Sequence, residues 1–262
     1  MKHNKTTFFP SPGIILIYFI SCLLKNGYAG QALPETLAEI KPGIVAVGTF
    51  MPTRSPRGVF LGTGFAVGDG SLIATNAHVL PKSLDVGHME EIAVFVRRDG
   101  KAEMAYTKKM AVDLTHDLAI LKISGQGRLP PLKLGAVEQV REGQLYAFTG
   151  YPIGMVLGLF PVTHRGIVSA ITPMVIPQLS AKQLNKKMLK RLRDPYNVFQ
   201  LDATAYPGNS GSPLYDVTTG DVVGIINKVF VKESKETVLS NPSGITYAIP
   251  INHLKSLLKK LN

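Results

Sequence analysis

The stretch PGNSGSPL, Pro207–Leu214, decides how this chain is interpreted, because Ser210 within it is either a catalytic nucleophile or a serine in a tight turn. Glycine, asparagine, serine and proline gather in turns because they tolerate positive φ or hydrogen-bond to their own backbone. On this stretch alone the turn is the simpler interpretation. A serine hydroxyl is a weak nucleophile at its own pKa, so a catalytic role requires a base and an acid elsewhere in the chain.

Two other motifs supply candidates for the base and the acid. His78 ends the apolar run in TNAHVL, Thr75–Leu80, and Asp117 precedes the apolar run in HDLAILK, His116–Lys122. Taken singly, His78 fits a hydrogen-bonded core histidine and Asp117 fits a residue that caps a turn. Taken with Ser210, the imidazole accepts the hydroxyl proton and the carboxylate fixes the imidazole tautomer. The three residues therefore form a candidate Ser-His-Asp triad.

The order of these residues along the chain discriminates between scaffolds. His, Asp, Ser is the order of chymotrypsin-type β-barrels, whereas an α/β-hydrolase runs Ser, Asp, His. After Ser210 only His253 remains, and the G-x-S-x-G elbow fails because residue Ser212 takes the place of its last glycine. Gly208 fits the barrel interpretation, since its backbone N–H and that of Ser210 are expected to form an oxyanion hole. Asp113 is a weaker candidate for the acid.

Short apolar runs bounded by turn residues recur along the chain and predict strands. The sequence lacks the strand–helix alternation of a parallel sheet, so an all-β barrel or a pair of barrels is expected. A short helix is predicted at Leu37–Ile40 after Pro34, another at 251–262, and Ser180–Arg193 is a third candidate. The predicted strands are Gly43–Phe50, Gly62–Gly68, Ser71–Leu80, Glu91–Arg97, Leu118–Ile123, Gln144–Gly150, Gly166–Ile171, Val198–Ala203, Asp221–Phe230 and Gly244–Pro250.

The first residues predict a secretory signal peptide, residues 1–29. Lys2 and Lys5 precede the uncharged apolar run Gly13–Leu24, and small residues before Ala29 favour cleavage there. A retained membrane anchor and a lipoprotein signal at Cys22 are the alternatives, but the run is short for a membrane span. Cys22 is the only cysteine, so the processed chain is expected to have no disulfide.

The composition supports an exported globular chain. Of its 262 residues 45% are hydrophobic, enough for a sizeable core, and the formal net charge is +11. Basic residues concentrate in 180–193. This segment is either a solvated surface helix or a contact site for an anionic surface or an acidic partner. No specific nucleic acid is predicted.

The quoted motifs together resemble those of HtrA/Deg-type trypsin-like serine proteases. The resemblance rests on TNAHVL, HDLAILK, DATAYPGNSGSPL and GITYAIP, with further matches in GTGFAV, in GYPIG at Gly150–Gly154 and in VTHRGIVSAI at Val162–Ile171. It implies two six-stranded antiparallel β-barrels with a C-terminal helix. One protease domain, 30–262, is expected, with barrels at about 43–135 and about 140–250 and the terminal helix at 251–262.

The resemblance also implies an exported serine endopeptidase that acts through an acyl-enzyme, in envelope protein quality control or in processing of specific substrates. His78 corresponds to the base, Asp117 to the acid, Ser210 to the nucleophile, and Gly208 with Ser210 to the oxyanion hole. Substrate-binding positions would be Thr204, Ala205, Tyr206, Asn227 and Val229. Thr204 falls at the pocket floor in place of an acid, and Ala205 and Val229 are small and apolar. A small or medium apolar P1 side chain is therefore expected, not lysine or arginine.

Several features depart from that family. Its members usually carry PDZ domains after the terminal helix, and none is expected here. The usual Gly-Gly after the nucleophile is Gly211-Ser212, which is expected to be tolerated if the second residue keeps negative φ. The alternative function is a chaperone-like or binding module on a protease fold with weak or conditional catalysis. A periplasmic or secreted location is expected, and Gln31–Lys41 lacks the aromatic residues of family trimers, which favours a monomer.

No cofactor and no metal are predicted. His88, His116, His164 and His253 show no metal-ligand spacing, and no cysteine accompanies them.

Overall fold

The computed structural model describes residues 32–98, 101–152, 158–174, 195–227 and 244–261. The predicted signal peptide, the basic segment 180–193 and Val229 lie outside these ranges. Neither α-helix in the described part is long and apolar enough to span a membrane.

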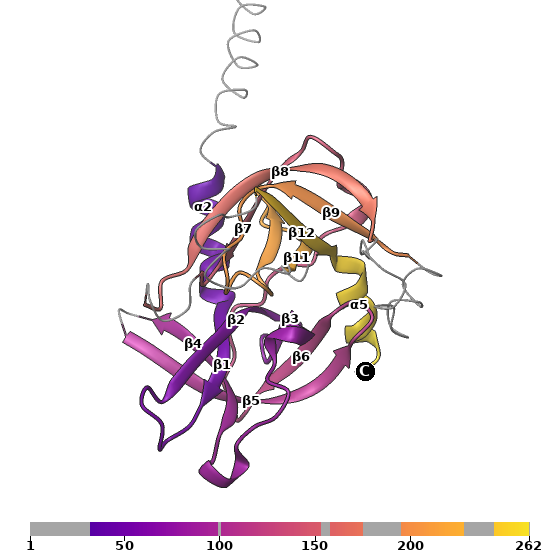
Figure 1. The fold of residues 1–262 in the computed structure, drawn as a ribbon. Helices are drawn as coiled ribbons and strands as arrows, with labels where there is room; N and C mark the ends of the chain where they lie inside the picture. Colours follow the sequence, from indigo (N-terminus) through magenta and orange to yellow (C-terminus); the bar gives the residue numbers. More distant parts are fainter. Residues whose placement is uncertain (1–31, 99–100, 153–157, 175–194, 228–243, 262) are drawn as a thin grey trace, which may run out of the picture.

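The N-terminal half forms a closed antiparallel barrel (Figure 1). Its strands follow one another around the barrel in the order β1-β2-β3-β6-β5-β4. They are β1 (Ile44–Phe50), β2 (Gly58–Val67), β3 (Leu72–Asn76), β4 (Glu91–Arg98), β5 (Lys101–Asp113) and β6 (Leu118–Ile123).

The C-terminal half forms a second closed barrel in the order β10-β11-β12-β9-β8-β7. Together the two barrels confirm the predicted all-β fold of two six-stranded barrels. The strands are β7 (Leu145–Gly150), β8 (Val162–Pro173), β9 (Asn197–Asp202), β10 (Pro213–Asp216), β11 (Val222–Asn227) and β12 (Ile245–Pro250).

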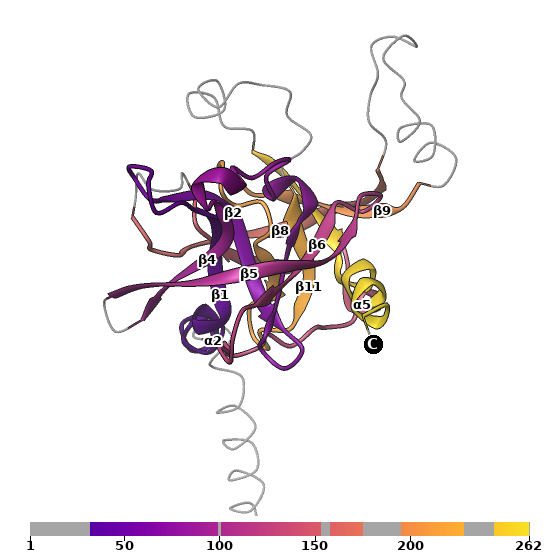
Figure 2. The same cartoon turned by 90° about the horizontal axis from the view of Figure 1, so that it is seen from below.

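Two helices flank the barrels and lie on different sides of them (Figure 2). The predicted terminal helix is α5, Ile251–Lys259, and it contacts β5 of the first barrel as well as β11 and β12 of the second. The predicted short helix at Leu37–Ile40 is longer, because α2 spans Ala32–Ile40. Pro34 lies in its first turn, where a missing N–H breaks no helical hydrogen bond.

Strands β5 and β10 were not predicted. β5 carries lysines and other exposed residues along most of its length, so it lacks the apolar run that marks a strand. It pairs with both β4 and β6 and closes the first barrel. β10 is only four residues long and directly follows the Ser210 turn. Short, polar or Pro-initiated strands leave a weak sequence signal.

Alternate residues of the buried strands face different cores. In β1, Val45 and Val47 belong to the core inside the first barrel, whereas Ile44 and Ala46 belong to a core between the barrels. This follows from the two-residue period of a strand. Because both faces are covered, β1 reads as a continuous apolar run rather than an alternating one.

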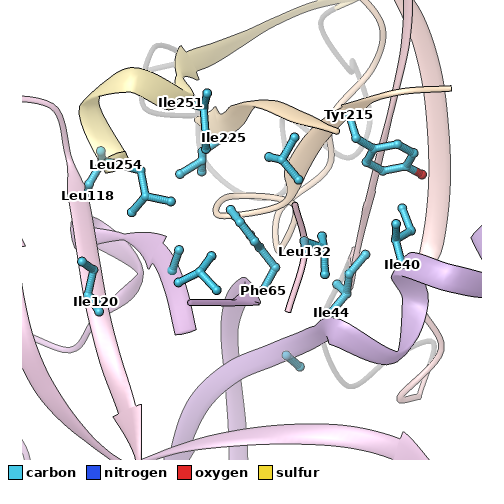
Figure 3. Close-up of a cluster of buried hydrophobic side chains, with 14 of the residues drawn as sticks. Ile40, Ile44, Phe65, Leu118, Ile120, Leu132, Tyr215, Ile225, Ile251 and Leu254 are labelled. Carbon is cyan, nitrogen blue, oxygen red and sulfur yellow. The ribbon is translucent and has the colours of Figure 1, made fainter. Parts of the chain in front are cut away.

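The core between the barrels joins both barrels and the two helices (Figure 3). Phe65 comes from β2, Tyr215 from β10, Ile225 from β11 and Leu254 from α5, and each is at most 1% exposed. Burying one such side chain contributes roughly 1.5–3 kcal/mol. The packing therefore fixes the two barrels against each other and with them the residues that project between them.

The connection between the barrels is hydrogen-bonded to both. We name residues 129–135 the strap. Its Leu129 and Leu132 N–H groups donate to Gly70 and Ala66 of the first barrel, at 3.0 and 2.9 Å. On the other side, its Lys133 carbonyl oxygen accepts the N–H of Val222 in β11 at 2.8 Å.

Candidate active site

Asp117 sits in a strained turn between β5 and β6. Its φ is 56°, in the left-handed region that non-glycine residues rarely occupy. Two donors hold its carbonyl oxygen: the N–H of Ala77 at 3.0 Å and the Nδ2 of Asn76 at 3.1 Å. The backbone is thus locked, and the nearly buried carboxylate has a defined direction.

His78 lies on a short 3-10 turn, Ala77–Val79, that follows β3. Its Nδ1 is 2.6 Å from Asp117 Oδ2, and its backbone N–H donates to Asp117 Oδ1 at 3.0 Å. The imidazole is 36% exposed, against 9% for the carboxylate. With Nδ1 engaged by the acid, Nε2 is the nitrogen left for a substrate or a nucleophile.

Asn227 at the end of β11 completes the surroundings of the acid. Its Nδ2 donates to Asp117 Oδ2 at 2.9 Å, and the residue is 2% exposed. The substrate-binding role that the resemblance implies for Asn227 stays a prediction, and in the structure its amide faces the carboxylate. Because this donor comes from the second barrel and the acid from the first, the bond spans the junction of the barrels.

Ser210 follows a tight turn, Tyr206–Asn209. The Asn209 N–H donates to the Tyr206 carbonyl oxygen at 3.0 Å, and Gly208 has φ of 100°. Proline at the second position and positive φ at the third define a type II turn. Within the described residues, the N–H groups of Gly208 and Ser210 have no protein acceptor. They are available to a ligand oxygen.

Thr63 of β2 holds this turn from the first barrel. Its hydroxyl donates to the Gly208 carbonyl oxygen at 2.7 Å and accepts the Tyr151 N–H at 2.9 Å. Its own N–H donates to the Ser210 carbonyl oxygen at 2.8 Å. The Thr75 hydroxyl in turn donates to the Thr63 carbonyl oxygen at 2.7 Å. The Ser210 turn is therefore bonded to the wall of the opposite barrel.

Gly62 brings Ser210 close to the His78 turn. A Cβ at Gly62 would lie 2.7 Å from a methyl carbon of Val79 and 2.9 Å from the Ser210 carbonyl oxygen. Val79 directly follows His78, so the base and the serine flank one point on β2. Within the described residues, no hydrogen bond joins the Ser210 hydroxyl to His78. Such bonds are often long in a free enzyme and shorten on substrate binding.

The rival acid Asp113 has a different partner. Its carboxylate accepts the N–H groups of Thr115 and His116 and lies 2.6 Å from His116 Nδ1. Burial alone would raise the pKa of Asp113, but the hydrogen bonds from His116 outweigh it and the pKa is lowered. Asp113 therefore caps its own turn, and Asp117 is the carboxylate that faces His78.

Thr204, Ala205 and Tyr206, which are predicted to bind substrate, lead into the Ser210 turn. Ala205 is buried in the core of the second barrel, while Thr204 and Tyr206 are half-buried. Ser212 keeps negative φ and Gly211 has φ of 90°, so the Gly-Ser pair is accommodated as expected. The described residues contain no group of three or more potential metal-ligating side chains.

Sequence reasoning missed Thr63, Thr75 and Asn76 as supports of the site. All three are fully buried polar residues in predicted strands. The available signal was the polar residue itself, because a threonine or asparagine inside a buried strand requires a hydrogen-bond partner. Which partner it finds depends on the pairing of the two barrels, which the local sequence does not encode.

The sequence of this chain is similar to those of known serine proteases. Residues 62–225 match the model of the family described as the trypsin-like peptidase domain. Serine protease HTRA4 of Homo sapiens is 32% identical over 200 residues, which cover 76% of this chain and 34% of that protein. A probable periplasmic serine endoprotease DegP-like of Halomonas elongata is 33% identical over 195 residues, which cover 73% of this chain and 33% of that protein.

The chain thus spans about a third of the length of these relatives. Among solved structures, the HtrA-type protease AlgW with a tripeptide is similar, with a TM-score of 0.60 and 24% sequence identity. The match covers 87% of this chain and 63% of that one. At this identity the similarity shows a shared fold of two barrels.

Proposed function

The chain belongs to the family of trypsin-like peptidases, similar to the HtrA/DegP serine proteases, and from that premise we propose that it is a serine endopeptidase with the triad His78, Asp117 and Ser210. The support for this assignment is the hydrogen bond of 2.6 Å between Asp117 and His78, across from a turn that presents two free N–H groups. The resemblance expected from the sequence is confirmed by these relatives.

In the proposed reaction, the Ser210 Oγ attacks the carbonyl carbon of the scissile peptide bond. His78 Nε2 takes the hydroxyl proton, and Asp117 stabilises the imidazolium and fixes its orientation. The Gly208 and Ser210 N–H groups donate to the oxygen that becomes negatively charged. His78 then returns the proton to the leaving amine, which leaves Ser210 acylated. Water activated by the same histidine hydrolyses the acyl-enzyme.

Asn227 has a positioning role in this proposal. Its amide donates to Asp117 Oδ2 and comes from the second barrel, so it couples the position of the acid to the alignment of the two barrels. A loss of that alignment would disturb the acid and the Ser210 turn together.

The proposed location is the periplasm or the exterior of the cell, after cleavage of residues 1–29. The support is the N-terminal sequence pattern and relatives that are named periplasmic endoproteases. Proteins and peptides are the proposed substrates, in envelope quality control or specific processing. Intact-mass measurement of the exported protein tests the cleavage site: a retained N-terminus would contradict the signal peptide.

The basic segment 180–193 remains a proposed contact site for an anionic surface or an acidic partner. Its support is the sequence alone, since this segment lies outside the described residues. Reversing the charges of Lys186, Lys187, Lys190 and Arg191 is expected to weaken binding to anionic vesicles and to acidic substrate proteins. Unchanged binding to both would reject the proposal.

Fluorophosphonate labelling of the purified protein tests the triad. The wild type is expected to be labelled, and Ser210→Ala and His78→Ala are expected to lose labelling while keeping the wild-type circular dichroism spectrum. Mass spectrometry should place the probe on Ser210. A folded wild type that is not labelled would instead support a binding module with conditional catalysis.

A further inference from the structure

His164 is a titratable residue of β8 beside the Ser210 turn, and the proposed mechanism does not use it. Its ring stacks on Phe148 with the centroids 4.9 Å apart and the planes at 19°. The ring of Tyr206, the first residue of the type II turn, lies 5.9 Å away. His164 is therefore enclosed between the second barrel and the turn that carries Gly208.

The sheet register shows which way His164 faces. Phe148 of β7 pairs directly with His164, and paired residues of antiparallel strands project from the same face. Phe148 is 1% exposed and belongs to the core inside the second barrel, together with Ala205. His164 thus points toward the barrel interior, but at its margin, since the residue is only half-buried.

The pairing of β8 with β9 places His164 alongside the predicted substrate-binding stretch. Ile167 of β8 pairs with Asp202, the last residue of β9. Gly166 packs against the next residue, since a Cβ there would lie 2.8 Å from the Cβ of Ala203. β8 runs antiparallel to β9 and to the residues that follow it. His164, two residues before Gly166, therefore lies beside the stretch that leads to Tyr206.

The ring carries a polar atom without a partner. Nε2 of His164 is buried, and no hydrogen bond to it exists within the described part of the chain. Burying an unpaired polar atom is costly, and one beside a candidate active site points to a ligand that supplies the missing partner. Burial also lowers the pKa of His164, so the imidazole is neutral near pH 7, with one N–H donor and one acceptor nitrogen.

The proposed reaction fixes where the substrate lies relative to this ring. The attacked carbonyl carbon meets Ser210 Oγ, and its oxygen lies between the N–H groups of Gly208 and Ser210. The side chain of that same substrate residue, the P1 residue, must then lie beside the Tyr206–Asn209 turn. His164 is at the side of the turn formed by Tyr206.

We infer that His164 is a specificity-determining residue, and that its Nε2–H donates to the carboxamide oxygen of a glutamine or asparagine at P1. Phe148, on which the ring stacks, and Ala205 of the same buried cluster are apolar, so this environment disfavours a fully charged P1 side chain. This inference rests on the proposed endopeptidase function. It differs from the apolar P1 preference expected from Ala205 and Val229, which stays a prediction, and the test below distinguishes the two.

The test is cleavage of a proteome-derived peptide library, with the cut sites read by mass spectrometry. Wild type is compared with His164→Leu, and with His88→Leu as a matched control at an exposed histidine of the first barrel. Fluorophosphonate labelling of each variant is measured in parallel, because that probe has no P1 side chain. Equal labelling shows that His164→Leu leaves the fold and the triad intact.

The expected result is a P1 position enriched in glutamine and asparagine for wild type and His88→Leu. In His164→Leu, kcat/KM for a glutamine P1 peptide should fall about tenfold, the loss expected for one hydrogen bond, while aliphatic P1 peptides gain. The inference would be overturned if the wild type is labelled but cuts after aliphatic, basic or acidic residues, and if His164→Leu leaves this P1 preference unchanged. Absence of both labelling and cleavage in wild type would instead count against the endopeptidase function, and the inference would fall with it.

Discussion

The hydroxyl of Thr63 donates a hydrogen bond of 2.7 Å to the carbonyl oxygen of Gly208, so a strand of the first barrel holds the turn on which the second barrel presents Ser210. The orientation of a peptide unit in a type II turn depends on contacts of this kind, because flipping the central peptide gives a type I turn at little cost. Thr63 therefore supports the free N–H of Gly208 without approaching the substrate.

Thr63→Val is expected to lower the rate of fluorophosphonate labelling by about 10- to 100-fold, because the Gly208 carbonyl and the Tyr151 N–H both lose their partner. Stability should fall by about 1–3 kcal/mol, as for other unpaired buried groups. Thr107→Val is the matched control, since Thr107 is also buried and donates to Ile92 in the first barrel. A Thr63→Val protein that is labelled at the wild-type rate would show that the Tyr206–Asn209 turn keeps its conformation without the Thr63 hydroxyl.

Asp117→Asn is expected to reduce peptide hydrolysis by about 10³- to 10⁴-fold, because the amide no longer stabilises an imidazolium and favours the wrong His78 tautomer. Asparagine tolerates the left-handed φ of 56°, so backbone strain should add nothing to the loss of stability. The amide NH2 would face an N–H donor, so the unfolding free energy should fall by about 1–3 kcal/mol. Asp113→Asn, at the neighbouring carboxylate, should stay within about threefold of wild-type activity. Equal losses in both variants would contradict the assignment of the acid.

Gly211→Ala is expected to destabilise the protein by more than about 3 kcal/mol. The residue has φ of 90°, and a Cβ would lie 2.0 Å from the Thr63 carbonyl oxygen. Gly143→Ala isolates the cost of the backbone angle, because its φ is 85° but nothing lies within 4 Å of the added carbon. That variant should lose only about 1–2 kcal/mol. Urea unfolding of the pair measures the difference, and equal losses would show that the close approach to Thr63 relaxes freely.

Stability should fall as the pH is lowered from about 6.5 toward 4, through His253. Burial first, and then the neighbouring His116, lower the pKa of His253 from 6.5 to about 4. The unfolded chain therefore binds the proton before the folded one does, and protonation favours unfolding in this interval. Asp113 opposes the shift, and Tyr196 packs against both rings.

His253→Phe should remove about 1–2 kcal/mol of that pH dependence, allowing for partial solvent screening. Phenylalanine preserves a ring against His116, whose centroid is 3.9 Å from that of His253. Denaturant midpoints at pH 4.5 and pH 7.5 give the comparison, with the exposed His88→Phe as control. If the midpoint of His253→Phe shifts between pH 4.5 and pH 7.5 by as much as that of the wild type, the acid sensitivity belongs to another group.

Much of the fold followed from short-range patterns. Strands such as β1 and β6 are apolar on both faces, so they stand out as runs whatever their partners. β5 did not, because its lysines face solvent and its role is to close a barrel by pairing with β4 and β6. The dipeptide Asp99-Gly100, which favours two-residue hairpin turns, was the available signal for that strand.

Part of the candidate site could likewise be predicted from the sequence, and part could not. His78, Asp117 and Ser210 were predicted from motifs, because chemistry restricts both the residue types and their order. The contacts of Thr63 with Gly208 and of Asn227 with Asp117 join residues 145 and 110 positions apart. Such contacts depend on how two barrels dock, and no local pattern specifies that. In the sequence, His164 stands out only as a histidine without metal-ligand spacing, and the folded structure places its ring beside that of Tyr206.

The strap has a consequence for dividing the molecule. A cut in the exposed loop 124–127 leaves all six strands of the first barrel in one fragment and the strap with the second barrel in the other. The second fragment then carries a peptide tail that already matches the Gly70 and Ala66 carbonyl groups of the first. We therefore expect two separately expressed fragments divided at this loop to reassociate through the strap. Under the proposed triad, only the reassembled pair would bring His78 and Asp117 to Ser210.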